Sequence, residues 1–600
     1  MPERTGFQHK TITRFVFCMV IPFLFMLPVK ADDTKIKLGP TGPCKLVRNN
    51  ALNTQTSTDG FDNWHMCEFT PPANPAVPLK KHEGTLLLQS VIDSSHIDIL
   101  KDDFSISNIP TVSRFPRVAL DFIQNGTDII PLQRGTIASE HLYWDVIFEP
   151  GKIWKDQTDP ESSRVALPFS LQEKNANCIH NGVLTFALKA NDSVESLHYL
   201  INGETCAYFQ FDMWGTLQGH YQAKTFPIAG DVLNKHFDEV AVRLPVKNFR
   251  ELKQTYPEID IRNLLSQNSE HVSVFGIVLN GVNYRSDCNT RSGSYPFCDV
   301  LDLPSFSTAK SMFAALSMMR LEKLYPGTMQ VTVGELINEC QANDSWKDVT
   351  LSHLLNMASG HYGSKLHDID ENSKAMRQFF LSQSHTEKIQ LACTLYPRRS
   401  IPGKNWVYHT SDTYLAGTLM NQLLRNKFPS LPTQQKDIYQ DIMVKQIWQP
   451  LKLSPVLNTT RRTSDSFQQP FSGWGLTYHL DDILRLSIFL GVQANLANGQ
   501  SLFAENALRA ALQRDPQNRG LKAINSKLRY KNGFWAYNIA DAIQCNEALW
   551  VPFMSGFGGI TVVLFPKGTI YYVYSDNHEF SWLNVAKEVN KIMPMCTTSE

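Results

Sequence analysis

Short apolar runs separated by turn-forming residues fill the first half of the chain, from residue 32 to about residue 245. The clearest runs are GTLLLQSVI, HLYWDVIF, GVLTFALKA and CAYFQFDMWG. Runs of this length, rich in β-branched and aromatic residues, are typical of strands. We therefore expect residues 32–245 to form a β-rich, sandwich-like N-terminal domain, whose role the pattern does not disclose.

Strand-like and helix-like segments are mixed after residue 245. HVSVFGIVLNGVNYRS predicts two strands and long helical stretches follow, before ITVVLFP and TIYYVYS predict a closing hairpin and WLNVAKEVNKIM a final helix. Strands at both ends with helices between them favour one antiparallel sheet assembled from distant segments, with helices packed on it. Residues 246–600 are therefore expected to form a second domain of the α+β class.

The beginning of the chain has the pattern of a targeting segment. Basic residues precede the apolar run FVFCMVIPFLFMLPV, and Val29-Lys30-Ala31 resembles a small-x-small cleavage site. An uncleaved anchor is the alternative, but the run falls short of the roughly 20 apolar residues needed to span a bilayer, and Pro22 interrupts it. We predict a signal peptide at residues 1–31 and a mature chain that is secreted or periplasmic.

Cysteine usage agrees with export. Removal of Cys18 with the signal peptide leaves ten cysteines, an even number that suits five disulfides. The spacing does not fix their connectivity, and pairing between sequence neighbours, such as Cys288 with Cys298, is the simplest arrangement. Because no C-x-x-C pair is present, we expect no metal centre.

The net charge of the chain narrows the class of binding partner that we expect. Lys plus Arg and Asp plus Glu number 57 each, so no net field favours nucleic acid or an anionic membrane. The aromatic cluster Tyr208, Phe209, Phe211 and Trp214 could bind a glycan, but aromatic side chains along a strand more often fill a core. A glycan or protein contact through the N-terminal domain is left open.

The stretch SFSTAK, residues 305–310, carries the first candidate chemistry. Ser305 is a favourable N-cap, and apolar residues follow at helical spacing, so a helix is predicted to begin here. Ser307 then lies in the first turn, where unpaired N–H groups stabilise an oxyanion, and Lys310 lies one turn later. A buried lysine loses its proton more readily and can act as a base. Ser-x-x-Lys alone is a weak motif, since a solvated lysine is the ordinary alternative.

Four further segments strengthen this interpretation. They are TLSHLLNMASGHYG, PGKNWVYHTSDTYLAGTLM, FSGWGLTYHLDDILRLSIFL and MSGFGGITVVLFP. Together with SFSTAKSMFAAL they resemble, in order, the motifs of the serine β-lactamase, DD-peptidase and related esterase superfamily. The resemblance spans roughly residues 272–593. It implies a β-lactamase-like fold for the second domain, an S-x-x-K nucleophile and base, and no metal or organic cofactor.

The resemblance also implies roles for individual residues. Tyr408 matches the catalytic tyrosine beside Ser307 and Lys310, and Thr410 stands where class C β-lactamases carry asparagine. The third motif supplies substrate-binding or oxyanion groups at Ser555, Gly556 and Phe557.

Two departures shift the expected substrate. Met554 replaces the cationic residue that helps to hold a β-lactam carboxylate, and Y-x-T in place of Y-x-N resembles the esterase and 6-aminohexanoate-oligomer hydrolase branch. We therefore expect an exported serine hydrolase that acts on a small or peptide-like ester or amide. The alternatives are a cell-wall DD-peptidase or β-lactamase, and an inactive secreted protein that binds through its N-terminal domain. His361 and His409 are assigned no role.

Overall fold

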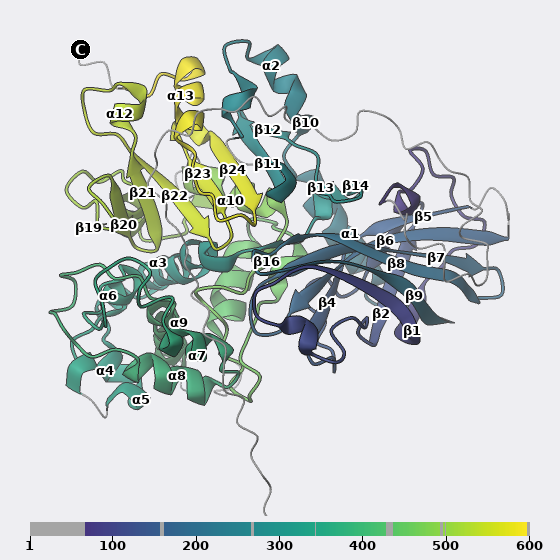
Figure 1. Cartoon of the computed structure of the whole chain (residues 1–600), viewed down its shortest axis with the longest axis horizontal. Helices are drawn as coiled ribbons and strands as arrows, with labels where there is room; N and C mark the ends of the chain where they lie inside the picture. Colours follow the sequence, from purple (N-terminus) through teal and green to yellow (C-terminus); the bar gives the residue numbers. More distant parts are fainter. Residues whose placement is uncertain are drawn as a thin grey trace, which may run out of the picture.

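The structure, a computed structural model, describes residues 66–155, 161–265, 269–341, 344–427, 436–491, 496–497 and 500–596. The predicted signal peptide lies outside these residues. Figure 1 shows a β-rich body built from the first part of the chain beside a mixed body built from the rest. One continuous apolar cluster contains side chains of both bodies, such as Phe169 and Phe313.

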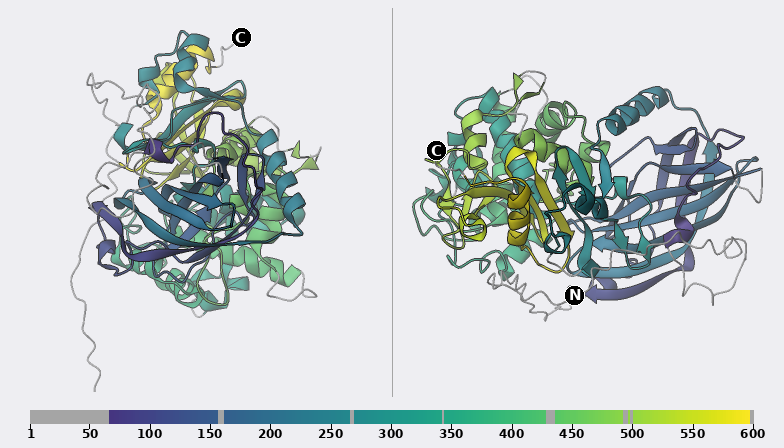
Figure 2. Two further views of the ribbon diagram at one scale, coloured as in Figure 1. Left: turned by 90° about the vertical axis from the view of Figure 1, so that its right-hand side faces the viewer. Right: turned by 90° about the horizontal axis from the view of Figure 1, so that it is seen from above.

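The first body is a single antiparallel sheet that closes on itself. Its strands follow the order β4-β6-β5-β3-β2-β1-β9-β8-β7, and an additional β6–β7 pairing completes a barrel (Figure 2, left). The expected β-rich character is present, but the architecture is a closed barrel and not two stacked sheets. Irregular pairing of β1 with β9 at two points bends these strands and helps closure. The strands are β1 Gly84–Asp102, β2 Val118–Asn125, β3 Asp128–Pro131, β4 Trp144–Phe148, β5 Gly151–Lys155, β6 Ser162–Glu173, β7 Ile179–Lys189, β8 Val194–Thr205 and β9 Phe209–Ala223.

Aromatic and aliphatic side chains fill the barrel. The ring of Phe115 lies 5.2 Å from that of Phe169 and 5.4 Å from that of Tyr199. In the aromatic cluster singled out from the sequence, three residues are buried and the fourth is partly exposed, stacked on His96. The core interpretation is confirmed for the three, which are Tyr208, Phe209 and Phe211.

The second body contains the predicted sheet from distant segments. Its strand order is β10-β12-β11-β24-β23-β22-β21-β20-β19, antiparallel except for the β10–β12 pair. The closing hairpin is confirmed as β23 and β24. The strands are β10 Val246–Asn248, β11 Val272–Leu279, β12 Val282–Arg285, β19 Leu521–Lys522, β20 Leu528–Lys531, β21 Phe534–Asn538, β22 Trp550–Gly556, β23 Ile560–Leu564 and β24 Ile570–Ser575. The domain boundary expected at residue 245 falls between helix α1 and β10, and it stays a prediction.

Helices cover both faces of this sheet (Figure 1). Alternate side chains of β11 and β24 enter two separate apolar clusters, one shared with α2 and α13 and the other with α3, α9 and α10. The helices are α1 Ala229–Ala241, α2 Leu252–Thr255, α3 Leu316–Leu324, α4 Val333–Leu336, α5 Asn338–Gln341, α6 Leu351–Leu355, α7 Lys374–Leu381, α8 His385–Thr394, α9 Thr410–Lys427, α10 Leu480–Gly491, α11 Glu505–Ala511, α12 Ala540–Ile543 and α13 Leu583–Ile592.

Each disulfide between described cysteines joins two cysteines that have no other cysteine between them in the sequence. The predicted Cys288–Cys298 pair is confirmed. Cys67 is also disulfide-bonded. The other pairs are Cys178–Cys206, Cys340–Cys393 and Cys545–Cys596.

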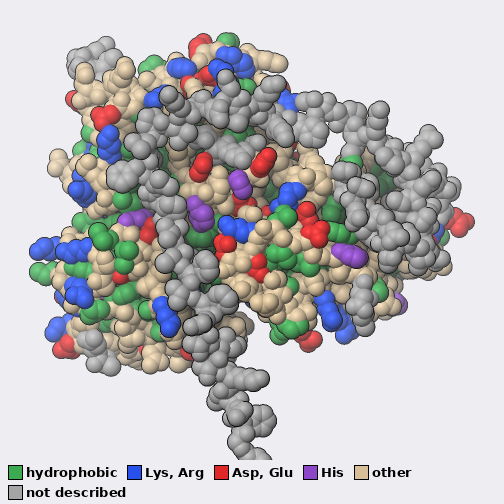
Figure 3. Space-filling view, viewed as in Figure 1, with side chains coloured by type: hydrophobic (Ala, Val, Ile, Leu, Met, Phe, Trp, Pro, Cys, Tyr) green, Lys and Arg blue, Asp and Glu red, His purple; other side chains and the backbone are tan. Residues whose placement is uncertain are grey.

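The surface mixes both signs of charge. Lysine, arginine and acidic side chains are interspersed over the described part of the face in Figure 3, in keeping with the equal totals of 57. Among the described residues, no helix has both the length and the apolar character needed to span a bilayer.

Candidate active site

Ser307 and Lys310 lie together directly after the short strand β15 (Leu303–Pro304). The Lys310 Nζ atom is 3.0 Å from the Ser307 Oγ atom. Ser307 is partly exposed, whereas Lys310 is only 1% exposed. A reachable hydroxyl beside a buried amine is the arrangement that a serine nucleophile and its base require.

The backbone around this pair departs from the regular helix that the sequence predicts. A 3-10 turn at Phe306–Thr308 leads into a π-helical turn at Lys310–Ala315, and only then does α3 begin. The Ser305 side chain does not cap the helix, because it donates to Asn177 of the barrel (3.0 Å). Phe306 has a φ of +39°, a left-handed value that is unfavourable for a phenylalanine. Irregular helical turns of this kind are frequent at functional sites.

Lys310 has acceptors on two further sides. Its Nζ atom lies 2.9 Å from Thr410 Oγ1 and 3.1 Å from the carbonyl oxygen of Gly473. The Thr410 hydroxyl donates its own proton to Glu371 Oε1, so it accepts from Lys310. Thr410 and Gly473 therefore each accept a hydrogen bond from the amine of Lys310. A neutral amine has two N–H bonds, so its lone pair is left facing Ser307.

Burial makes this neutral form accessible. Desolvation lowers the pKa of Lys310 to about 8, while the carboxylate of Glu371 acts in the opposite direction. Burial likewise raises the pKa of Glu371, against the attraction of Lys310 and the bonds that Thr410 donates to it. With this pKa, roughly a tenth of Lys310 is unprotonated at pH 7, far more than for a lysine in water.

Tyr408 completes the group from the segment that precedes α9. Lys310 Nζ lies 5.0 Å from the centroid of the Tyr408 ring, and that ring stacks on Trp535 of β21 at 5.9 Å. Burial raises the pKa of Tyr408 well above its usual value, although a hydrogen bond with Ser307 lowers it. Tyr408 therefore keeps its proton at neutral pH.

The third motif lies against the Ser307 turn. A Cβ atom on Gly556 would lie 2.9 Å from the carbonyl oxygen of Ser305, so only glycine fits without displacement. The ring of Phe557 lies 5.6 Å from that of Phe306, and Ser555 is partly exposed. The end of β22 thus lies against the turn that carries Ser307.

Met554 lies in the apolar core and is 0% exposed. The position that carries a cation in the related motif therefore presents no charge here. Thr410, predicted to contact substrate, is 2% exposed, and its hydroxyl is hydrogen-bonded to Lys310 and Glu371.

Two contributors were missed from the sequence. Gly473 supplies an acceptor through its backbone, and Glu371 reaches Lys310 through Thr410. Glu371 lies in the polar stretch HDIDENS, which has no periodic or motif signal that could have identified it.

The two histidines that received no role contact other side chains. His409 Nε2 lies 3.0 Å from Asp370 Oδ2, beside Glu371, and His361 stacks on Trp346 at 3.7 Å.

Among the described residues, one buried cluster has the composition of a metal site. The ligand atoms of Glu149, Asp302 and His479 lie within 4.8 Å of one another, and His479 Nε2 is 3.3 Å from Glu149 Oε1. Burial opposes protonation of His479, but the surrounding carboxylates, Glu149 first, raise its pKa overall. Glu149 is also paired with the buried Arg134 at 2.6 Å, and burial raises the pKa of Asp302 to about 7, so the cluster forms an ionic contact between the barrel and the second body.

Comparisons with known proteins were made for the sequence and for the fold. No family model and no curated protein sequence matches the chain. Solved structures that resemble it include a penicillin-binding protein homologue from Caulobacter crescentus (13% identity, 58% of this chain and 97% of the other, TM-score 0.39). EstCE1, a hydrolase with promiscuous acyltransferase activity, is 13% identical over 59% of this chain and 99% of its own (TM-score 0.39). Simvastatin synthase (LovD) from Aspergillus terreus is 15% identical over 57% of this chain and 94% of its own (TM-score 0.37).

Proposed function

We propose that this protein is an exported serine hydrolase that cleaves an ester or amide through an acyl-enzyme on Ser307. One observation carries the proposal: Lys310 lies 3.0 Å from Ser307 while Thr410 and Gly473 accept its N–H bonds. The predicted signal peptide and the four disulfides between described cysteines support export.

Acylation begins when Ser307 Oγ attacks the substrate carbonyl carbon and Lys310 Nζ takes the hydroxyl proton. The carbonyl oxygen becomes an oxyanion, which the backbone N–H groups of Ser307 and Phe557 would hold. Tyr408 donates its proton to the leaving alcohol or amine as the bond to carbon breaks, and it regains a proton from Lys310. Water then attacks the acyl carbon, and the same groups act in reverse.

The substrate is expected to lack a carboxylate beside the scissile bond. Met554 is buried and uncharged, so it offers no ion pair to such a group. Esters and unusual amides are therefore favoured over β-lactams and D-alanyl peptides.

The central test compares wild type with Ser307→Ala on p-nitrophenyl acetate and on a fluorescent fluorophosphonate. We expect turnover and covalent labelling in wild type, peptide mapping of the label to Ser307, and loss of both in the variant with an unchanged circular dichroism spectrum. Equal turnover by the purified variant would refute the assignment.

A panel of ester, D-amino-acid amide and β-lactam probes separates the remaining functions. Stable labelling of Ser307 by a fluorescent penicillin would favour a DD-peptidase or β-lactamase. No labelling by any probe, together with glycan or protein binding by the chain, would favour an inactive binding protein.

A further inference from the structure

One side chain of the barrel reaches the turn that carries the nucleophile. Asn177 lies just before β7 and is 0% exposed. Its Oδ1 atom accepts from Ser305 Oγ at 3.0 Å and from the backbone N–H of Phe306 at 2.7 Å. Phe306 is the residue directly before Ser307, so this amide is bonded to the two residues that precede the nucleophile.

The same amide also holds the segment that positions the base. Asn177 Oδ1 accepts from the N–H of Gly475 at 3.2 Å, and Asn177 Nδ2 donates to the carbonyl oxygen of Leu476 at 3.2 Å. Gly473, two residues before Gly475, supplies the carbonyl that accepts from Lys310. One asparagine thus contacts both the turn that precedes Ser307 and the segment whose Gly473 accepts from Lys310, and it adds to the direct hydrogen bonds between Ser305 and Leu476.

The hydrogen bond between Phe306 and Asn177 is made where the backbone has an unfavourable conformation. A phenylalanine with a φ of +39° is held against its backbone preference. The 2.7 Å bond from its N–H to Asn177 is made in this conformation. Without it, the turn can relax toward an ordinary helical start and carry Ser307 away from Lys310.

A second barrel segment contacts the other wall of the site. The ring of Tyr208 lies 6.1 Å from that of Phe557, whose N–H is the proposed oxyanion donor. A Cβ atom on Gly558 would lie 3.4 Å from the Cβ atom of Ala207, so these segments pass close to each other.

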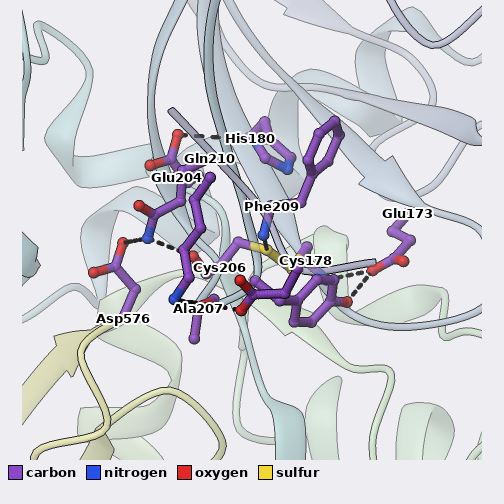
Figure 4. The surroundings of a disulfide bond; sticks show 12 residues. Glu173, Cys178, His180, Glu204, Cys206, Ala207, Phe209, Gln210 and Asp576 are labelled. Atoms are coloured by element: carbon purple, nitrogen blue, oxygen red, sulfur yellow. Dashed lines mark hydrogen bonds and ion pairs between the residues drawn. A yellow bond between two sulfur atoms is a disulfide. The ribbon is translucent and has the colours of Figure 1, made fainter. Parts of the chain in front are cut away.

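A disulfide joins the two barrel segments. Cys178 directly follows Asn177, Cys206 directly precedes Ala207, and the two cysteines are bonded (Figure 4). Figure 4 also shows Gln210, which donates to the Cys206 carbonyl at 2.9 Å and to Asp576 of the second body at 2.8 Å. The disulfide therefore fixes the distance between the segment on the nucleophile turn and the segment on the oxyanion turn.

We propose that Asn177 is a positioning residue through which the barrel holds Ser307 in its reactive orientation, and that the Cys178–Cys206 disulfide holds Asn177 in place. The proposal rests on the proposed function of Ser307. Asn177 does not touch the reacting atoms, so its effect is on the rate of acylation and not on substrate contact.

The first experiment measures kcat, KM and the rate of fluorophosphonate labelling of Ser307 in Asn177→Ala. Since a misplacement of about 1 Å costs about 10²-fold in rate, we expect kcat and the labelling rate to fall about 10²-fold with KM nearly unchanged.

The matched control is Asn181→Ala. Asn181 is another buried barrel asparagine, and it bonds both backbone groups of Asp302 and neither residue that precedes Ser307. Its labelling rate should stay within a few fold of wild type. A loss in Asn181→Ala equal to that in Asn177→Ala would overturn the proposal, because general loosening of the interface would then explain both.

Asn177→Asp adds a readout that a merely structural role would not move. An ionised carboxylate accepts from the Ser305 hydroxyl and the Phe306 N–H but repels the Leu476 carbonyl, whereas a protonated one donates to it. The labelling rate of Asn177→Asp relative to wild type should therefore rise as the pH is lowered from about 8 to about 5.5. A ratio independent of pH would contradict the role of the amide.

The disulfide is tested by replacing both of its cysteines with serine. We expect a fall of 10-fold or more in the labelling rate of Cys178→Ser/Cys206→Ser, and little change in the control Cys545→Ser/Cys596→Ser, whose bond joins the loop after α12 to the end of the described chain. Equal rates in the two double variants would refute this part. Failure of wild type to label at all would instead refute the proposed function, so the two failures are distinguishable.

Discussion

Burial lowers the pKa of Lys310, the proposed base, and Glu371 opposes that shift, so we expect Glu371→Gln to change the charge of Lys310. The carboxylate is separated from Lys310 by the single hydroxyl oxygen of Thr410, and it is the one charged group that acts to raise the pKa of Lys310. Two unit charges about 5 Å apart interact by about 3 kcal/mol at an effective dielectric constant of about 20. That energy corresponds to about two pKa units.

The direction of the expected pH shift follows from the protonation state of Lys310 that the reaction needs. Attack by Ser307 requires neutral Lys310, so kcat/KM in wild type should rise with pH and level off above a pKa of about 8. Removing the negative charge favours the neutral amine. The rising limb of Glu371→Gln should therefore move to lower pH by one to two units, and its plateau should fall because a weaker base accepts the proton less readily.

The assay is kcat/KM for p-nitrophenyl acetate between about pH 5.5 and 9.5, corrected for spontaneous hydrolysis. The control is Asp370→Asn, which removes the neighbouring carboxylate that pairs with His409 and not the one that acts on Lys310. An unmoved or upward-shifted limb in Glu371→Gln, or the same shift in Asp370→Asn, would show that Glu371 does not set the charge of Lys310.

Three further predictions concern single groups of the site. Tyr408→Phe should lower kcat by about 10²–10⁴ for an alkyl ester and much less for a p-nitrophenyl ester, whose leaving group needs no proton; equal losses on both would contradict proton donation. Gly556→Ala places a methyl group 2.9 Å from the Ser305 carbonyl and should slow fluorophosphonate labelling about 10-fold, whereas Gly491→Ala, with open space at that position, should not. Lys310→Met should abolish turnover yet raise the Tm at pH 7, because burying an amine with a pKa of about 8 costs about 3 kcal/mol there. The cost is present below pH 8 and fades toward pH 10.5, so the Tm advantage should shrink over that range.

Local patterns identified much of the fold. The hairpin of β23 and β24 and the helix α13 lie where apolar periodicity placed them. Residues 246–265, VKNFRELKQTYPEIDIRNLL, have apolar residues at helix-like spacing, but they form β10, two 3-10 turns and the four-residue helix α2. Amphipathic spacing is satisfied there by short turns that dock on β11 and β12, a tertiary contact that local pattern cannot reveal. Barrel closure was missed for the same reason, since it also requires β1 to pair with β9 from the far end of the barrel segment, as Gly84 does with Ala223.

The residues of the site likewise fall into two groups: those that belong to a sequence motif and those that only the fold brings together. Ser307, Lys310 and Tyr408 belong to ordered motifs, and the structure brings Lys310 within contact of the other two. Glu371 and Asn177 lie outside any motif, and each acts through one hydrogen-bonded intermediary that only the fold supplies. The role of Thr410 as a substrate contact stays a prediction. Its predicted place as a substrate contact comes from the motif, whereas in the fold its hydroxyl links Lys310 to Glu371.

The turn that precedes Ser307 lies where the barrel meets the mixed sheet. Ser305 and Phe306 are bonded on one side by Asn177 of the barrel, and Gly556 at the end of β22 lies against the carbonyl oxygen of Ser305 on the other. A backbone held at a φ of +39° persists only where its surroundings over-determine it. Neither body alone supplies both restraints, so the geometry that brings Ser307 to Lys310 belongs to their interface, and separating the barrel from the second body should remove activity even if each part folds.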